Sequence, residues 1–280
     1  MTTAMKRASC VIGWPAKHSR SPKLHGYWIK RYGIDGDYRI EEKSPDEFAV
    51  FVRNLAANGY VGANITMPHK AAALALSEPD DRARAVGAAN TLWLDNGKLR
   101  STNTDVEGFI DALDAAAPGW DKRTESSVVL GAGGASRAVG YGLIERGIKT
   151  IHIVNRTYEK AEAIRDRFGK SVQPARWEDL PYLLKGSKLL VNATSLGMKG
   201  QPELVVDLGT MANDAAVSDI IYVPLKTPLL IAAEECGLAT SNGLSMLLHQ
   251  AVRGFELWFG VRPEVTSELF DLLKADIIRT

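Results

Sequence analysis

A glycine-rich turn between an apolar strand and a helix constrains this chain most. Residues 127–130 form an apolar run, the turn Gly-Ala-Gly-Gly follows at 131–134, and residues 135–146 have the pattern of a helix. A second apolar run at 150–154 completes a strand–helix–strand unit, which requires parallel strands joined by a right-handed crossover. Further strand candidates lie at 188–191 and 217–221. The pattern therefore predicts a parallel sheet of the doubly wound α/β class.

The same turn indicates nucleotide binding. A helix that starts directly after such a turn offers its unpaired backbone N–H groups to a dinucleotide pyrophosphate. The spacing departs from the common G-x-G-x-x-G, and tight turns that bind nothing also need glycine, so the turn alone leaves both interpretations open. The candidate cofactor-binding residues of the turn are Gly131, Ala132, Gly133, Gly134 and Ala135.

The residues after the second strand distinguish between the two nicotinamide cofactors. Enzymes that use NAD usually place Asp or Glu here for the adenosine ribose, whereas this chain has Asn155, Arg156 and Thr157. A guanidinium suits a ribose 2′-phosphate and would find no partner on the bare hydroxyl of NAD. Thr157 can also be the N-cap of a helix expected at 158–168. The sequence predicts NADP, and a solvated surface arginine is the alternative.

The N-terminal region also alternates strands and helices. Ser44 and Glu47 match a capping box, and Ser21 followed by Pro22 is typical of an N-cap with proline at the first helical position. Another helix is expected from Pro68 to Leu76. Strands are expected at 9–13, 60–66, 88–94 and 99–102, the last two joined by a turn at 95–97. An Ala-Pro-Gly connection at 117–119 then leads into the second α/β region.

Composition narrows the class of partner. The chain has 280 residues, enough for two cores, and its 34 Lys and Arg nearly balance 33 Asp and Glu. This charge favours a small-molecule partner over nucleic acid or a membrane surface. The N-terminus lacks the pattern of a secretion signal and the apolar runs are too short to cross a bilayer, so we expect a cytoplasmic protein. Cys10 and Cys236 are far apart, which predicts two reduced, buried thiols and no metal site.

Several segments, in order along nearly the whole chain, resemble the shikimate dehydrogenase family. The most distinctive are Asn-Ile-Thr-Met-Pro-His-Lys at 64–70 and Asn-Thr-Asp at 103–105. The resemblance implies NADP-dependent, reversible reduction of 3-dehydroshikimate to shikimate in aromatic amino-acid biosynthesis. The other resembling segments are 13–15, 19–22 with His25, 89–91, 131–138, 155–157, 192–195, and 242–246 with Gln250.

The resemblance also implies the domain plan and the roles of individual residues. We expect a two-domain α/β protein with residues 1–105 as the N-terminal part of a substrate-binding domain, 106–238 as a Rossmann-like NADP-binding domain, and 239–280 as C-terminal helices that return to the substrate domain. A cleft would separate the domains. Lys70 and Asp105 would be the catalytic pair. The implied substrate-binding residues are Ser19, Ser21, Asn64, Thr66, Asn90, Tyr222 and Gln250, and Thr194 and Gly243 join the cofactor-binding set.

This set of residues suits the chemistry. A small ring with several hydroxyls and one carboxylate needs many short donors and acceptors, and the protein must move one proton at the reacting oxygen, which lysine can do. Alternatives remain open: Ser21 could cap a helix, Asn90 and Asn103 could bond loop backbone groups, and Gln250 could be an exposed helical residue. His69 is expected to pack or hydrogen-bond locally.

Three other classes of protein are alternatives to a shikimate dehydrogenase. A quinate/shikimate dehydrogenase of broader specificity usually prefers NAD, which Arg156 argues against. A catalytically silent NADP-binding protein would lack the Lys70 and Asp105 pair. A folate-linked methylene dehydrogenase would have no use for the polyol-binding side chains. Both a monomer and a homodimer are compatible with the sequence.

Overall fold

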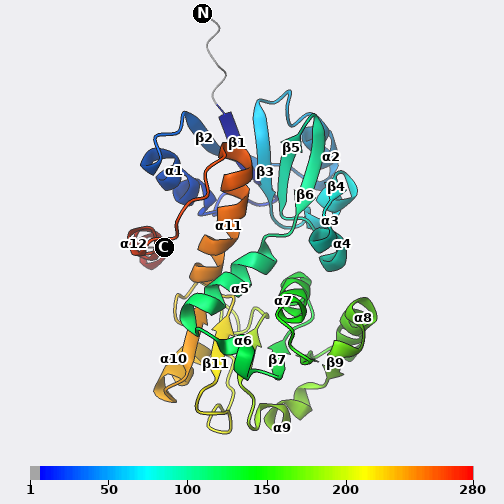
Figure 1. The fold of residues 1–280 in the computed structure, drawn as a ribbon, viewed down its shortest axis with the longest axis vertical. Coiled ribbons are helices and arrows are strands. Elements are labelled where there is room, and N and C mark those ends of the chain that lie inside the picture. The colour runs from blue at the N-terminus through cyan, green and yellow to red at the C-terminus, as the bar shows by residue number, and fades with distance from the viewer. Residues whose placement is uncertain (1–6, 280) are drawn as a thin grey trace, which may run out of the picture. The chain divides into compact units, whose positions relative to one another are not determined.

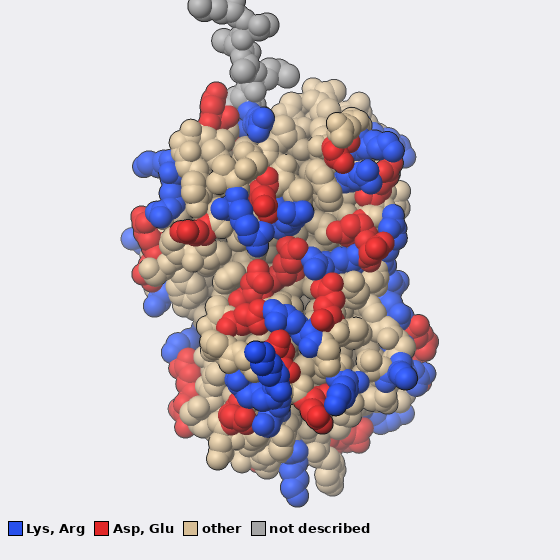
Figure 2. Space-filling model, in the orientation of Figure 1, with Lys and Arg blue, Asp and Glu red and all other residues tan. Residues whose placement is uncertain are grey.

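The computed structural model describes residues 7–279 and contains two compact units (Figure 1). The first unit comprises the described residues up to Thr104 together with Gln250–Leu273, and the second comprises Asp105–His249 with the residues from Lys274 onward. Each unit is built on one six-stranded sheet. No helix within residues 7–279 is long and apolar enough to cross a membrane. Lysine and arginine are interspersed with acidic residues on the face shown in Figure 2, in keeping with a net charge of +1.

The sheet of the first unit is mixed, with the strand order β2-β1-β3-β5-β6-β4. Strands β1, β2 and β3 are parallel, while β5 is antiparallel to both β3 and β6. Asn96 and Gly97 join β5 to β6 with positive φ angles of 51° and 80°, the backbone of a type I′ hairpin turn. The elements are β1 Arg7–Gly13, α1 Ser21–Arg31, β2 Gly36–Glu42, α2 Pro45–Arg53, β3 Tyr60–Ile65, α3 Lys70–Ala75, β4 Glu78–Pro79, α4 Asp81–Val86, β5 Thr91–Asp95 and β6 Lys98–Thr102.

The C-terminal residues of the first unit are held by tryptophan hydrogen bonds. Trp258 belongs to α11 (Gly243–Phe259), and its indole N–H donates to the Leu92 carbonyl at 2.8 Å. The Trp28 indole of α1 donates to the Glu264 carbonyl at 3.0 Å. Trp28 and Phe255 are fully buried and pack edge to face, with ring centroids 5.3 Å apart. These contacts explain why Gln250–Leu273 completes the core of the first unit.

The sheet of the second unit is entirely parallel, with the order β12-β11-β10-β7-β8-β9. If β7 to β12 are numbered 1 to 6 along the chain and the sheet is read from β9, the order is 3-2-1-4-5-6. This is the strand order of doubly wound dinucleotide-binding domains. Apolar side chains from both faces of the sheet form two buried clusters. The strands are β7 Ser126–Leu130, β8 Thr150–Val154, β9 Val172–Ala175, β10 Leu189–Asn192, β11 Ala216–Asp219 and β12 Ala239–Asn242. The remaining helices of the chain, including short 3₁₀ turns, are α5 Asp105–Ala116, α6 Trp120–Arg123, α7 Gly134–Glu145, α8 Tyr158–Phe168, η1 Gly169–Ser171, η2 Trp177–Asp179, α9 Leu180–Leu184, α10 Pro228–Glu235, α11, and α12 Ser267–Ile278.

Several predicted elements of the first unit differ from the structure. Ser21 is not an N-cap but the first residue of α1, because Arg20 already has helical φ and ψ angles. Helix α3 begins at Lys70 rather than Pro68, after a turn in which the His69 N–H donates to the Thr66 carbonyl. The strand predicted from residue 88 begins at Thr91. The capping box at α2 is confirmed, since the Ser44 N–H donates to the Glu47 carboxylate at 2.9 Å.

In the second unit the predicted strand–helix–strand unit is confirmed, and β8 and α8 have the predicted bounds. Strands β9 and β12 were not predicted. Because β12 pairs in parallel with β11, residues 239–242 belong to the nucleotide-type sheet, and the predicted boundary at 239 lies before this strand. The prediction of two buried thiols is wrong for Cys236, which is exposed at the end of α10, and right for Cys10.

Candidate functional site

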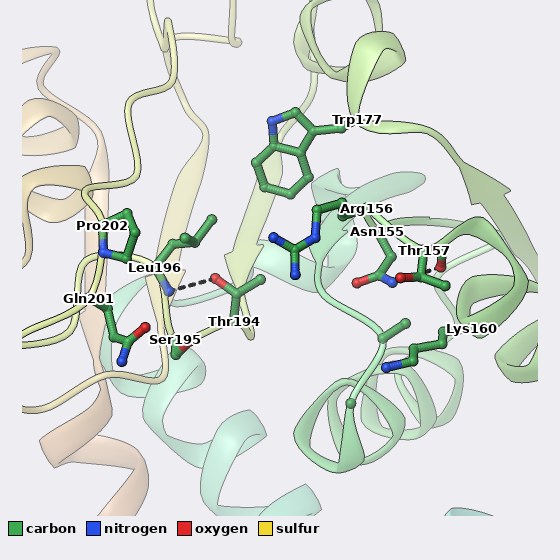
Figure 3. Close-up of a pocket in the computed structure, with 12 residues that line it drawn as sticks. Asn155, Arg156, Thr157, Lys160, Trp177, Thr194, Ser195, Leu196, Gln201 and Pro202 are labelled. Atoms are coloured by element: carbon green, nitrogen blue, oxygen red, sulfur yellow. Dashed lines mark hydrogen bonds between the residues drawn. The ribbon is translucent and has the colours of Figure 1, made fainter.

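A cavity of about 550 Å³ lies in the second unit, at the carboxyl ends of β7, β8, β9 and β10 (Figure 3). The chain order of the strands reverses between β7 and β10, and ligands of open α/β sheets bind at this switch point. The cavity is lined by the turn after β7, the segments after β8 and β9, and the loop after β10. Its lining residues are Ala132, Gly133, Asn155, Arg156, Thr157, Lys160, Trp177, Thr194, Ser195, Leu196, Gln201 and Pro202.

The turn after β7 requires glycine at its first position. Gly131 has a φ of +99°, and a side chain there would place its Cβ 2.9 Å from Thr194 Cγ2 and 3.0 Å from the Ala193 carbonyl oxygen. Glycine thus allows the ends of β7 and β10 to approach closely. Gly133 is the N-cap of α7, so the unpaired N–H groups of that helix begin at the cavity wall. This arrangement suits a pyrophosphate.

Two cations, four positions apart in the sequence, line the cavity. Arg156 follows β8, and Lys160 lies in the first turn of α8. Both side chains are exposed, and within residues 7–279 neither forms an ion pair. No acidic side chain is among the lining residues of the described chain. Two unpaired cations in one cavity attract an anion, and an arginine with a lysine suits a phosphate.

The opposite wall is fixed by a buried polar network. The Thr194 hydroxyl donates to Asn192 Oδ1 at 2.7 Å and accepts from the Leu196 N–H at 3.0 Å. The Asn192 amide donates to Asp219 Oδ1 at 3.1 Å, and the Thr227 hydroxyl donates to Asp219 Oδ2 at 2.7 Å. Burial raises the pKa of the Asp219 carboxyl, while these hydrogen bonds oppose the shift. The network holds Thr194 and Leu196 in place at the cavity.

The structure brings most of the predicted cofactor-binding residues together. Ala132, Gly133, Asn155, Arg156, Thr157 and Thr194 all line the cavity. In the described part of the chain, Gly131, Gly134, Ala135 and Gly243 do not line it. Gly243 begins α11, where its N–H donates to the Ile221 carbonyl at 3.0 Å and a side chain would collide with the Ile220 carbonyl. Tyr222 is half-buried in the loop after β11.

Lys160 and Trp177 line the cavity but were not among the predicted residues. The sequence did carry a signal for Lys160, because it lies in the first turn of the helix that is expected directly after Arg156 and Thr157. Trp177 follows a strand that was not predicted, so nothing in the sequence pattern linked it to the cavity.

In the first unit, several predicted substrate-binding side chains form one buried hydrogen-bonded cluster. The Tyr38 hydroxyl donates to Asn64 Oδ1 at 2.7 Å, which turns the Asn64 amide nitrogen toward the Thr91 hydroxyl 3.3 Å away. Asn90 Oδ1 accepts from the Thr104 N–H at 2.8 Å and from Thr91 Oγ1 at 3.1 Å. The side-chain amides of Asn64 and Asn90 are therefore fixed in orientation by Tyr38, Thr91 and Thr104, which were not among the predicted site residues.

The other predicted residues of the first unit lie after β1, after β3 and in α11. The Ser21 N–H donates to Ser19 Oγ at 3.3 Å, and the Thr66 N–H donates to the Ile12 carbonyl at 2.9 Å. The Lys70 carbonyl accepts from the Ala89 N–H at 2.9 Å, next to Asn90. Gln250 Oε1 lies 3.5 Å from the Thr104 hydroxyl. Asp105, the first residue of α5, belongs to the second unit.

Two buried histidines support the first unit. His69 stacks on Phe48 at a centroid distance of 4.2 Å and its Nε2 lies 2.7 Å from the Lys43 carbonyl, which confirms the predicted local packing. His25 stacks on Tyr38 at 4.1 Å, parallel within 10°, and is fully buried. Burial lowers the pKa of His25 to about 3, so the ring stays neutral beside the cluster that contains Asn64.

The second unit, with its strand order, glycine turn and cationic cavity, defines a dinucleotide-binding domain of the Rossmann type. Comparison with known families gives a finer assignment. The family described as shikimate dehydrogenase substrate binding domain matches residues 11–92, the shikimate / quinate 5-dehydrogenase family matches 116–222, and the shikimate 5′-dehydrogenase C-terminal domain matches 243–266.

Individual proteins agree with the family matches. The shikimate dehydrogenase (NADP(+)) of Rhodopseudomonas palustris (strain BisB18) is 62% identical over 271 residues, which cover 97% of this chain and 98% of that protein. The structure resembles shikimate 5-dehydrogenase from Thermus thermophilus in complex with NADP(H) and shikimate, with a TM-score of 0.83, 31% identity and 98% and 99% of the two chains covered.

Quinate dehydrogenase from Corynebacterium glutamicum in complex with NAD is a further structural neighbour, with a TM-score of 0.87, 29% identity and 96% and 99% of the two chains covered. This chain belongs to the shikimate dehydrogenase family.

Proposed function

We propose that this chain catalyses the reversible, NADP-dependent reduction of 3-dehydroshikimate to shikimate, a step of aromatic amino-acid biosynthesis. The observation that carries the choice of cofactor is the pair of cations at the cavity, Arg156 and Lys160, with no acidic side chain beside them among the described lining residues. The names of the relatives, shikimate dehydrogenase (NADP(+)), support the choice of both substrate and cofactor. The proposal includes the expected cytoplasmic location and holds for either a monomer or a homodimer.

The residues of the second unit fit NADP. The α7 N-terminus would hold the pyrophosphate, and Arg156 with Lys160 would hold the 2′-phosphate on the adenosine ribose. Thr194, fixed by Asn192 and Asp219, would form the facing wall. When bound, the reduced cofactor supplies the hydride for carbonyl reduction, so the protein has only to orient the reactants and move one proton.

The first unit supplies groups suited to a polyhydroxylated ring. Asn64 and Asn90 would contact hydroxyls of the substrate. Their amide orientations are fixed by Tyr38, Thr91 and Thr104. The other residues proposed to contact the substrate are Ser19, Ser21, Thr66, Tyr222 and Gln250. A fixed amide presents a defined donor or acceptor and loses little conformational entropy on binding. We propose that Lys70 donates a proton to the carbonyl oxygen during reduction and that Asp105 helps to orient the reacting hydroxyl.

A quinate/shikimate dehydrogenase of broader specificity is the second candidate. It is favoured by the structural likeness to a quinate dehydrogenase in complex with NAD. Quinate carries one hydroxyl more than shikimate, and rejection of an added hydroxyl depends on local pocket shape. The unpaired cations Arg156 and Lys160 argue for NADP in either case.

The direct test is to incubate the purified protein with 3-dehydroshikimate and NADPH, to follow NADPH by its absorbance, and to identify the product by NMR. The proposal predicts consumption of NADPH matched by formation of shikimate. Protein that is folded but leaves NADPH and 3-dehydroshikimate unchanged would contradict it. Lys70→Ala provides the control, because this variant should bind NADPH but turn over about 10²–10⁴-fold more slowly.

A further inference from the structure

We propose that Trp177 is a further binding residue of the nucleotide site and that its indole stacks on the adenine ring of the cofactor. The inference rests on the proposed function, because it takes the cavity of the second unit to be the NADP site. It assigns a residue to the base itself, in addition to the cations that select the 2′-phosphate.

The strand register places Trp177 beside Arg156. Strands β8 and β9 are parallel neighbours, and their last paired residues are Val154 and Ala175. The Asn155 N–H donates to the Ala175 carbonyl at 3.3 Å, so the pairing continues one step past the strands. Arg156 and Trp177 each lie two positions after the Val154–Ala175 pair. Equivalent positions on adjacent parallel strands lie side by side, and both residues line the cavity (Figure 3).

The segment that carries Trp177 is held in place. The preceding residue, Arg176, places its guanidinium 4.7 Å from the ring centroid of Tyr158, the first residue of α8. The Arg176 N–H donates to the Asp179 carboxylate at 2.9 Å. Trp177 itself is half-buried and packs against the apolar cluster on one face of the second sheet. The indole is therefore anchored on one side while its remaining surface faces the cavity.

The chemistry of the cavity identifies the ligand group that the indole would meet. Trp177 is the one aromatic side chain among the lining residues of the described chain. The cations Arg156 and Lys160 mark the ribose that carries the 2′-phosphate, and adenine is the base attached to that ribose. An indole next to these cations is therefore placed for adenine, and base–aromatic stacking is a strong and geometrically tolerant contact.

The experiment is isothermal titration calorimetry with adenosine 2′,5′-bisphosphate, which contains the adenine end of NADP and lacks nicotinamide. Trp177→Leu keeps an apolar side chain against the core but removes the aromatic face, and we expect its dissociation constant to rise about 5-fold to 100-fold. Trp177→Phe keeps a smaller aromatic face and should bind more tightly than Trp177→Leu. Tyr182→Ala is the matched control, because Tyr182 is an aromatic residue in the next helix that is 82% exposed and outside the cavity lining. Its affinity should equal that of the wild type.

The outcomes separate this inference from the proposed function. Adenine is common to NADP and NAD, so Trp177→Leu should weaken both cofactors alike and leave the preference for NADP unchanged, whereas loss of Arg156 should change the preference. Wild-type affinity in folded Trp177→Leu would overturn the assignment and leave NADP dependence intact. Loss of the NADP preference in Trp177→Leu would also overturn it, because Trp177 would then act through Arg156.

A second readout does not depend on the stability of the leucine variant. Adenosine 2′,5′-bisphosphate should quench the tryptophan emission of the wild type, and the quenching should be largely lost in Trp177→Phe. Equal quenching in both proteins would contradict stacking on Trp177.

Discussion

The buried His25 predicts a specific loss of stability in acid. Its ring lies between Tyr38 and Phe255, with centroid distances of 4.1 and 5.9 Å, and is also in contact with Trp28 and Trp258. Burial lowers the pKa of His25 from 6.5 to about 3 in the folded protein. Between these two values the unfolded chain binds a proton at His25 and the folded chain does not. Folding stability therefore falls as pH decreases from 6.5 towards 3.

The size of this loss of folding stability follows from the lowered pKa of His25. An assay pH of about 4.5 lies about 2 pH units below the ordinary pKa of histidine, so protonation stabilises the unfolded state by about 2.7 kcal/mol. This is a large part of the roughly 5–15 kcal/mol by which domains are normally stable. His25→Phe keeps an aromatic ring in the cluster and removes the titration, so its stability should change less between neutral pH and about pH 4.5, by about this amount.

The assay is urea unfolding at the two pH values, followed by tryptophan fluorescence. Only the difference between the pH values is compared, so a general effect of the larger ring cancels. His18→Gln is the control, because His18 is exposed and its replacement should leave the pH dependence of the wild type unchanged. If His25→Phe lost as much stability in acid as the wild type, the neutral, buried His25 would be the wrong explanation.

Three further predictions concern the proposed catalytic residue Lys70 and the proposed nucleotide-binding site. Arg156→Asp should reverse or erase the preference for NADP+ over NAD+ in steady-state kinetics, since charge-assisted hydrogen bonds contribute about 1.5–3 kcal/mol; an unchanged ratio would remove Arg156 from the phosphate site. Lys70→Ala should lower kcat about 10²–10⁴-fold, while calorimetry should show nearly unchanged NADP+ binding. Near-normal turnover of this variant across the pH range would exclude Lys70 as the proton donor. Asp219→Ala should raise the KM for NADP+ and lower Tm, because the Asn192 amide and the Thr227 hydroxyl lose their acceptor. Asp219→Asn should recover most of the lost affinity and most of the lost Tm. Equal defects in the two variants would show that Asp219 does not position Thr194 through Asn192.

The nucleotide-type sheet could be predicted well because its signals are local. The apolar runs of β7 and β8 and the glycine turn between them are continuous in sequence, and Thr157 marks the start of α8. Strand β9 was missed because it is only four residues long and contains Pro174, which is typical of an edge strand rather than a central one. Trp177 could not be linked to the cavity without the register between β8 and β9.

The candidate substrate-binding residues of the first unit were less predictable, because the hydrogen bonds that hold them join segments far apart in the sequence. Asn64 and Asn90 were selected through the family resemblance, but Tyr38 lies in a strand that alternates charged and apolar residues and gave no sign of a contact 26 positions away. The start of α1 was placed one residue late because Ser21-Pro22 has the composition of a cap, while the helical backbone of Arg20 decides where the helix begins. A residue type such as serine suggests an N-cap, but the backbone φ and ψ angles determine which residue is the cap.

The assignment of this chain as an NADP-dependent shikimate dehydrogenase can be checked by kinetics with two substrates and two cofactors. The kcat/KM of the purified protein is measured for shikimate and for quinate, each with NADP+ and with NAD+, from the initial rate of reduced cofactor formation. If the assignment is right, shikimate with NADP+ gives the highest kcat/KM, by about tenfold or more over shikimate with NAD+, as expected for one to two charge-assisted hydrogen bonds. A higher kcat/KM for quinate with NAD+ than for shikimate with NADP+ would contradict it.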